Sequence, residues 1–136
     1  MSLQPWIILL MIALLILAFG VYVLRYRKQH LTGKDIRKVR QHWAKIQDLA
    51  TLHPEQAIMN ADKLLDFALN QAGYTGTLGE KMKAAQAVFR DNDALWSAHK
   101  LRNRIAHVVD VRLDRQRTKG ALLAYKKAFY DLGITL

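Results

Sequence analysis

The chain has 136 residues, with 21 Lys and Arg against 11 Asp and Glu, and its formal net charge is +10. It contains no cysteine, which excludes disulfides, cysteine metal ligands and cysteine nucleophiles. A charge this positive favours an anionic partner, such as nucleic acid or the anionic leaflet of a membrane.

A long apolar stretch opens the chain. The first charged residue is Arg25, and the segment from Pro5 to Leu24 reads PWIILLMIALLILAFGVYVL. As a helix it would be about 30 Å long, which matches the hydrocarbon core of a bilayer. Its length, and the lack of a basic segment before it, favour an uncleaved anchor over a secretory signal peptide. We therefore predict a single-pass transmembrane helix at 5–24, after a short N-terminus at 1–4.

Basic residues crowd the C-terminal flank of this stretch. Only Asp35 opposes the cations Arg25, Arg27, Lys28, Lys34, Arg37, Lys38 and Arg40. The positive-inside rule then predicts residues 1–4 outside and the C-terminal domain in the cytoplasm, at the plasma (inner) membrane. The basic juxtamembrane neck, 25–34, would also contact anionic lipid, although setting the topology is the simpler role for its charges.

The remainder, 35–136, is predicted to be a cytoplasmic helical bundle. Apolar residues recur at intervals of three and four, Pro54 suits a first helical position, and Thr77-Leu-Gly-Glu80 has the form of a capping box. The predicted helices cover 35–52, 54–72, 78–89, 94–107 and 119–132, and the charged run before the last one is predicted as a loop. No segment has a strand pattern. The predicted fold class is all-α, an N-terminal transmembrane helix followed by a small antiparallel bundle of four or five helices.

The segment 94–107 combines a basic helix with side chains capable of chemistry. At about 100° per residue, one face of this helix is apolar and is predicted to face the core. That face consists of Ala94, Ala98, Leu101, Ile105 and Val108. Arg102, Asn103 and His107 fall on the opposite, outward face. Polar residues in that place form either a solvated surface or a site.

The run Arg102-Asn103-Arg104-Ile105-Ala106-His107 resembles the R-polar-x-x-x-H signature of HEPN domains. These are compact all-α bundles found in many prokaryotic RNA-cleaving toxins and defence proteins. The resemblance extends to the length and helical character of residues 35–133, and its motif specifies three positions. It implies a metal-independent endoribonuclease that acts as a homodimer, with the motifs of two subunits meeting across the interface. We accordingly expect no metal site and no small-molecule cofactor.

The resemblance implies a role for each motif residue. His107 would move a proton from or to the RNA, and Arg102 would hold phosphate oxygens and stabilise the charge of the transition state. Asn103 would orient the histidine or donate to phosphate. Because Arg102 and His107 are about 140° apart around the helix, a two-fold partner would help them converge. The predicted RNA-binding groove consists of Lys100, Arg104, Arg112, Arg115, Arg117 and Lys119.

A structural interpretation of the same motif stays open. Asn103 and His107 would then hydrogen-bond within the bundle, and Arg102 would pair with Asp62 or Asp66. We predict these two aspartates to be a half-exposed salt-bridge row rather than an acid–base pair or metal ligands. The protein would then bind RNA without cleaving it, or serve as a noncatalytic membrane-tethered protein-interaction or scaffold domain. The anchor favours a scaffold, or RNA handling at the membrane, because a soluble toxin needs none.

Overall fold

The computed structural model describes residues 4–26 and 31–136 of the chain. This part consists of six α-helices and contains no β-strand, so the all-α prediction is confirmed. The helices are α1 (Pro5–Tyr26), α2 (Gly33–Leu49), α3 (Pro54–Gln71), α4 (Leu78–Ala84), α5 (Asn92–His107) and α6 (Arg115–Asp131). Residues 1–3 of the predicted N-terminus, and 27–30 of the predicted neck with Arg27 and Lys28, lie outside the described residues.

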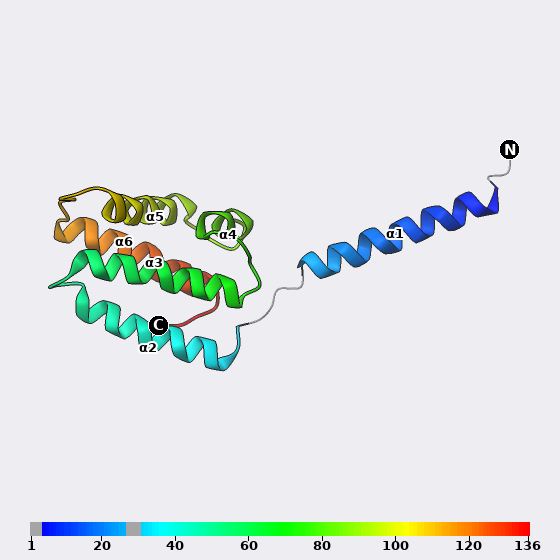
Figure 1. Ribbon diagram of the computed structural model, residues 1–136. Helices are drawn as coiled ribbons and strands as arrows, with labels where there is room; N and C mark the ends of the chain where they lie inside the picture. Colours follow the sequence, from blue (N-terminus) through cyan, green and yellow to red (C-terminus); the bar gives the residue numbers. More distant parts are fainter. Residues whose placement is uncertain (1–3, 27–30) are drawn as a thin grey trace.

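Helix α1 is long and apolar enough to cross a membrane over Pro5–Val23, and none of this window is buried. It makes no contact with the other helices of the described chain (Figure 1). Because the apolar side chains of this helix pack against no other helix, they are stable only in another apolar environment, such as the interior of a bilayer. A signal sequence near the start of a chain would have the same length and composition.

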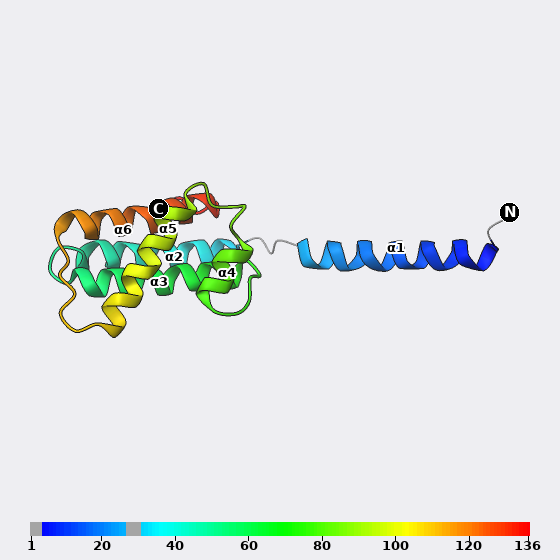
Figure 2. The ribbon, with the colours of Figure 1, turned by 90° about the horizontal axis from the view of Figure 1, so that it is seen from above.

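Helices α2 to α6 pack into one bundle (Figure 1). Seen from above in Figure 2, the axes of α2, α3 and α6 are nearly aligned, and α5 crosses them obliquely. The consecutive pairs α2/α3 and α5/α6 are antiparallel, whereas α3 and α6 run in the same direction. Helix α3 is central, since it contacts α2, α4, α5 and α6. The side chains of α3 therefore meet residues from every other part of the bundle.

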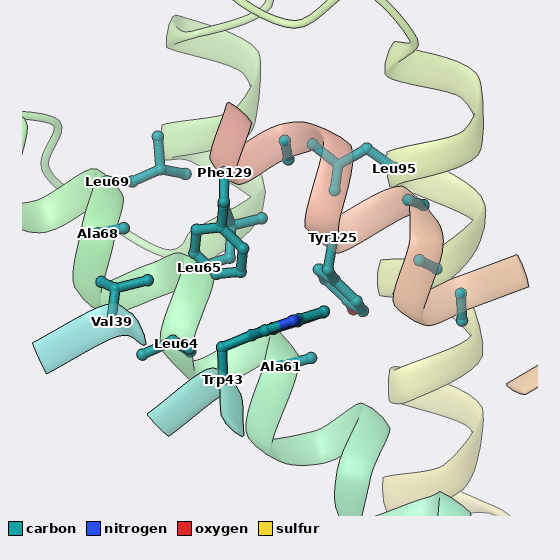
Figure 3. Close-up of a cluster of buried hydrophobic side chains, with 14 of the residues drawn as sticks. Val39, Trp43, Ala61, Leu64, Leu65, Ala68, Leu69, Leu95, Tyr125 and Phe129 are labelled. Atoms are coloured by element: carbon teal, nitrogen blue, oxygen red, sulfur yellow. The ribbon is translucent and has the colours of Figure 1, made fainter. Parts of the chain in front are cut away.

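The core lies between α2, α3 and α6 and is closed by α5 (Figure 3). Trp43 and Phe129 meet edge to face, with ring centroids 5.6 Å apart, a favoured geometry for aromatic pairs. The largest fully buried side chains of the core are Tyr125, Phe129, Ile46, Ile58, Leu65, Leu69, Met82, Leu95, Ile134 and Val39. Burying one large apolar side chain contributes about 1.5–3 kcal/mol, so this cluster supplies most of the driving force for folding.

Local sequence signals locate several helix ends as predicted. Pro54 is the first residue of α3, where its missing N–H costs no intrahelical hydrogen bond. The capping box at α4 is confirmed, because the Thr77 hydroxyl accepts from the backbone N–H of Glu80 and the Glu80 carboxylate accepts from that of Thr77. The hydrogen bond from the Thr77 backbone N–H, and a second one from the Thr77 hydroxyl to the same carboxylate oxygen, lower the pKa of Glu80 below its ordinary value. Asp91 caps α5 by accepting from the N–H of Ala94.

Two predicted boundaries were wrong. The third bundle helix ends at Ala84 rather than near Phe89, because the chain turns there and the Asn92 side-chain amide donates to the carbonyl of Phe89. The last helix begins at Arg115, four residues before the predicted start. Its cap is Asp114, which accepts from the N–H of Arg117 at 2.6 Å. The charged run is therefore divided: its part from Arg115 on is the first turn of α6, and its part before Asp114 is a loop, as predicted.

Candidate functional site

A carboxylate in the middle of α3 organises the polar interior of the bundle. The Asp62 side chain is only 4% exposed, and it lies where α3 faces both α5 and α6. Burying a charged carboxylate is costly unless hydrogen bonds and an opposite charge compensate. The prediction of a half-exposed aspartate was therefore wrong for Asp62. Side chains from the neighbouring helices supply these hydrogen bonds and the opposite charge.

Two hydrogen bonds reach one oxygen of this carboxylate. The Tyr125 hydroxyl on α6 donates to Asp62 Oδ1 at 2.8 Å, and His99 Nδ1 on α5 lies 2.8 Å from the same oxygen. A carboxylate only accepts, so Nδ1 of His99 carries a proton. Burial, followed by the charge and hydrogen bond of Asp62, raises the pKa of Tyr125 far above its ordinary value. The phenol therefore stays a donor.

Arg102 supplies the compensating charge. Its Nε lies 3.2 Å from Asp62 Oδ2, although this buried N–H does not point at an acceptor and forms no hydrogen bond with a described residue. The contact is therefore an ion pair at short range without hydrogen-bond geometry. The Arg102 side chain is 25% exposed, so part of the guanidinium still reaches solvent.

Asn103 closes the arrangement into a ring. Its Oδ1 accepts from Nη1 of Arg102 at 3.0 Å, and its Nδ2 lies 3.4 Å from Nε2 of His99. His99 returns to Asp62, which pairs with Arg102. We call these residues, together with Tyr125, the Asp62 network. Because its members come from α3, α5 and α6, it fixes the rotation of α5 against the other two helices.

The rotation of α5 differs from the predicted one. Leu95 is fully buried and precedes Arg102 by seven residues, so the two side chains lie within about 20° of each other around the helix. Arg102 therefore lies near the middle of the buried face, not on the outward face. The predicted core face was centred on a different side of the helix because it counted the alanines at 94 and 98 as core residues. Alanines fit an apolar period, but each buries little area and so contributes little to the packing.

His107 is not part of this network. It is the last residue of α5, it is exposed, and it has no hydrogen bond or ion pair with any described residue. Asn103 contacts a histidine four residues before it, rather than His107 four residues after it. The structural interpretation of the motif is thus confirmed for the pairing of Arg102 with Asp62, and the partner predicted for Asn103 was wrong.

His99 is a member of the network that the sequence motif does not include. It contacts Trp96 edge to face, at 5.9 Å between ring centroids, and its side chain is 13% exposed. A spacing of four residues from Asn103 was the sequence signal that could have identified it. Its pairing with Asp62, 37 residues away, has no signature in the sequence.

An open cleft of about 450 Å³ borders the Asp62 network. Asp62, His99 and Arg102 line it from one side, and the start of α4, with its N-cap Thr77 and Gly79, lines it from the other. A carboxylate that holds an imidazole by Nδ1 leaves Nε2 as a base. In this cleft Nε2 already faces Asn103, which limits its freedom to meet a substrate.

Asp66 is half-exposed and forms a salt bridge, as predicted, whereas Asp62 is buried. Its side chain is 44% exposed and pairs with Nζ of Lys81 at 3.0 Å. The lysine is the more buried partner, with 5% of its side chain exposed. The pair ties α4 to α3, and the two aspartates one turn apart thus have separate partners.

The six predicted RNA-binding cations are all exposed, but they do not surround Arg102. Lys100, Arg104 and Arg117 line a cleft of about 560 Å³ between α5 and α6, which we call the α5/α6 cleft. Arg115 and Lys119 line a separate cleft between α2 and α6. Arg112 lies on the connection between α5 and α6. The predicted groove is therefore divided over at least two surfaces.

The α5/α6 cleft lies on the other side of α5 from the Asp62 network. Arg102 and Arg104 are about 200° apart around the helix, and His107 is within about 60° of Arg104 and about 20° of Lys100. Apart from its three cations, the cleft is lined by Ala94, Ser97, Ala98, Leu101, Gly120 and Ala121. No acidic side chain lines it, and none of the three cations forms an ion pair with a described residue.

Among the described residues, no three His, Asp or Glu side chains gather as a set of metal ligands. Comparisons of the chain with protein-family models, with the sequences of curated proteins and with solved structures give no match. The resemblance to HEPN domains therefore stays a prediction that rests on Arg102, Asn103 and His107.

Proposed function

We propose that this protein is a membrane-anchored, noncatalytic RNA-binding domain, and that the α5/α6 cleft is its binding surface. The observation that carries the proposal is the cleft's charge. Lys100, Arg104 and Arg117 line it without an acidic neighbour, and no described residue neutralises any of them by an ion pair. Free cations in one concave surface attract phosphates, and the release of counterions from the nucleic acid drives their association.

The Asp62 network supports binding rather than cleavage. Arg102 would have to leave its buried partner Asp62 in order to hold the phosphate of a reacting nucleotide. That exchange would strand a charge in the interior, which is strongly unfavourable. Asn103 is likewise engaged between Arg102 and His99. The motif thus serves to hold α5 in place, and the cations on the far side of α5 stay available.

The proposed location is the cytoplasmic face of the plasma (inner) membrane. An apolar α1 that packs against no other described helix supports an anchor, and the basic residues from Arg25 to Arg40 support a cytoplasmic bundle by the positive-inside rule. RNA bound at the α5/α6 cleft would then be held near the membrane surface.

The test measures RNA affinity of the full chain in nanodiscs of uncharged phosphatidylcholine. Fluorescence anisotropy with a labelled single-stranded RNA should give a binding constant that falls steeply with salt. The double variant Lys100→Gln/Arg104→Gln should bind more weakly, with a salt slope smaller by about 0.7 for each phosphate that the variant no longer neutralises. The matched control Lys83→Gln/Lys127→Gln removes the same charge from exposed positions elsewhere and should keep the wild-type slope.

Two results would contradict the proposal. Equal decreases of affinity in both double variants would mean that net charge alone attracts RNA. Absence of salt-dependent binding by the wild type would leave the protein-interaction or scaffold role as the better account of the bundle.

RNA cleavage by a homodimer is the second candidate, and the position of His107 favours it. This exposed imidazole lies on the same side of α5 as Lys100 and Arg104, where it would reach a bound backbone. It would take the proton of a ribose 2′-hydroxyl, whose oxygen attacks the adjacent phosphorus and displaces the 5′-oxygen, and the leaving 5′-oxygen would receive a proton from the partner subunit's His107. In this candidate, cleavage proceeds with a chelator present and His107→Ala abolishes it without changing the circular dichroism spectrum.

A further inference from the structure

A second basic surface lies on the opposite flank of the bundle, between α2 and α3. It is a pocket of about 310 Å³, which we call the α2/α3 pocket. Its lining consists of Lys38, His42, Lys45, Ile46, Asn60, Lys63, Leu64 and Phe67. We propose that this pocket binds the headgroup of an anionic phospholipid and so docks the bundle onto the membrane that α1 enters.

The spacing of the basic residues places them on one stripe. Lys38, His42 and Lys45 are four and three residues apart on α2, so they share one face of the helix. Lys63 comes from the antiparallel α3 and closes the pocket from the other side. All four side chains are exposed. No acidic side chain lines the pocket, and no ion pair with a described residue involves its lysines.

The pocket combines this charge with an apolar floor. Ile46 and Leu64 are buried beneath it, and Phe67 is partly exposed. Nζ of Lys38 lies 4.5 Å from the ring centroid of Phe67, a cation–π contact that holds the ammonium group over the pocket. His42 Nδ1 donates to the carbonyl of Lys38 at 2.9 Å, so the ring is oriented as well. Cations above an apolar base suit the phosphate and glycerol of a lipid headgroup.

The position of α2 in the chain points to a lipid as the occupant. Six residues separate Tyr26, the end of α1, from Gly33, the start of α2, and a chain of that length reaches at most about 25 Å. Lys38 lies five residues farther on, about 8 Å along the helix. If α1 spans a bilayer, the pocket is therefore always within reach of its surface, where headgroups are the most concentrated phosphates. This inference depends on the anchor of the proposed function, but not on RNA binding.

The absence of cysteine makes a site-specific test direct. The exposed Asn70 on α3 is replaced by Cys, labelled with a fluorophore, and placed in the full chain in nanodiscs that contain nitroxide-headgroup lipid. We expect stronger quenching when the discs contain phosphatidylglycerol than when they contain phosphatidylcholine alone. Lys38→Gln, Lys45→Gln and Lys63→Gln should each lower the docking equilibrium constant about fivefold.

Matched variants separate docking by the pocket from general attraction. Lys83→Gln, Arg104→Gln and Lys127→Gln remove the same charge elsewhere and should leave the quenching unchanged, while circular dichroism should show the fold intact in all six variants. Equal decreases of quenching in both sets would overturn the proposal, as would equal quenching in the two kinds of disc.

A soluble phosphate is the competing source of the same chemistry. If inorganic phosphate at millimolar concentration abolished the quenching in phosphatidylglycerol discs, the pocket would be a site for free phosphate and the lipid proposal would be wrong. If added RNA reduced the nitroxide quenching of the label at position 70, and the pocket variants abolished RNA binding, the pocket would be part of the RNA-binding surface. That result would also overturn the proposal. If only the variants of the α5/α6 cleft lost RNA binding, the lipid proposal for the α2/α3 pocket would still hold.

Discussion

The two sides of α5 use the same residue type in opposite ways. Arg102 faces α3 and neutralises the buried Asp62, whereas Arg104 faces solvent in the α5/α6 cleft and forms no ion pair with a described residue. The two side chains are two residues apart in sequence and about 200° apart around the helix. One basic motif can therefore contain both a buried cation that holds the bundle together and an exposed cation that faces solvent. Which is which depends on the rotation of the helix against its neighbours.

The centre of the Asp62 network should be the most sensitive position. Asp62→Asn is expected to lower the free energy of unfolding by about 3–5 kcal/mol, because it leaves the Arg102 charge in the interior without its counterion. Urea unfolding of residues 31–136, whose described core contains no residue of α1, measures the effect. The exposed Asp48→Asn on α2 is the control and should stay within about 0.5 kcal/mol of wild type. Equal stability of the two variants would mean that the network is dispensable.

The pair of arginines gives the sharpest form of the comparison. Arg102→Ala should cost about 1.5–3 kcal/mol of stability, since a buried carboxylate loses its charged partner. Arg104→Ala should change stability by less than about 0.5 kcal/mol and weaken RNA binding instead. Thermal melts and anisotropy on both variants measure the two effects. If Arg102→Ala left the melting temperature unchanged and abolished RNA cleavage or binding, the motif would be a site rather than a structural network.

The Tyr125 hydroxyl should contribute less than the ion pair. Tyr125→Phe keeps the buried ring but removes one hydrogen bond to the carboxylate, and we expect a loss of about 1–2 kcal/mol. Because the folded state raises the pKa of this phenol, the unfolded chain loses its proton first. The stability of the wild type should therefore fall as pH rises above the ordinary tyrosine pKa, of about 10. Tyr125→Phe should have a flatter profile there, and a parallel decline in both proteins would contradict this assignment.

The smallest effect is expected at the exposed capping box of α4. The folded state lowers the pKa of Glu80, so its contribution is present above the ordinary carboxyl pKa and is lost as pH falls through the lowered value. Glu80→Gln should keep the cap and remove this acid dependence. Melting temperatures of both proteins from neutral to acid pH measure the difference. Identical acid profiles would show that the carboxylate does not contribute through its charge.

Local signals were sufficient for much of the architecture. The helical period, Pro54 and the Thr77–Glu80 box act over four residues or fewer, so they predicted the starts of α3 and α4. Helix α3 is central in the bundle, because an apolar surface wider than one stripe needs several partners. The start of α6 was missed because a charged run patterns like a loop, although Asp114 caps it.

The order of the residues along the chain was by itself enough to predict an apolar first helix and a basic all-α bundle, and it contains the motif near the end of α5. Only the tertiary structure decided that Asp62 is buried, that His99 rather than His107 joins Arg102 and Asn103, and that the cations lie on separate faces. The physical reason is that burial of the Asp62 charge depends on side chains from two other helices, among them His99 and Tyr125, which are 37 and 63 residues away in the sequence. Those partners meet only when the core sets how each helix is rotated.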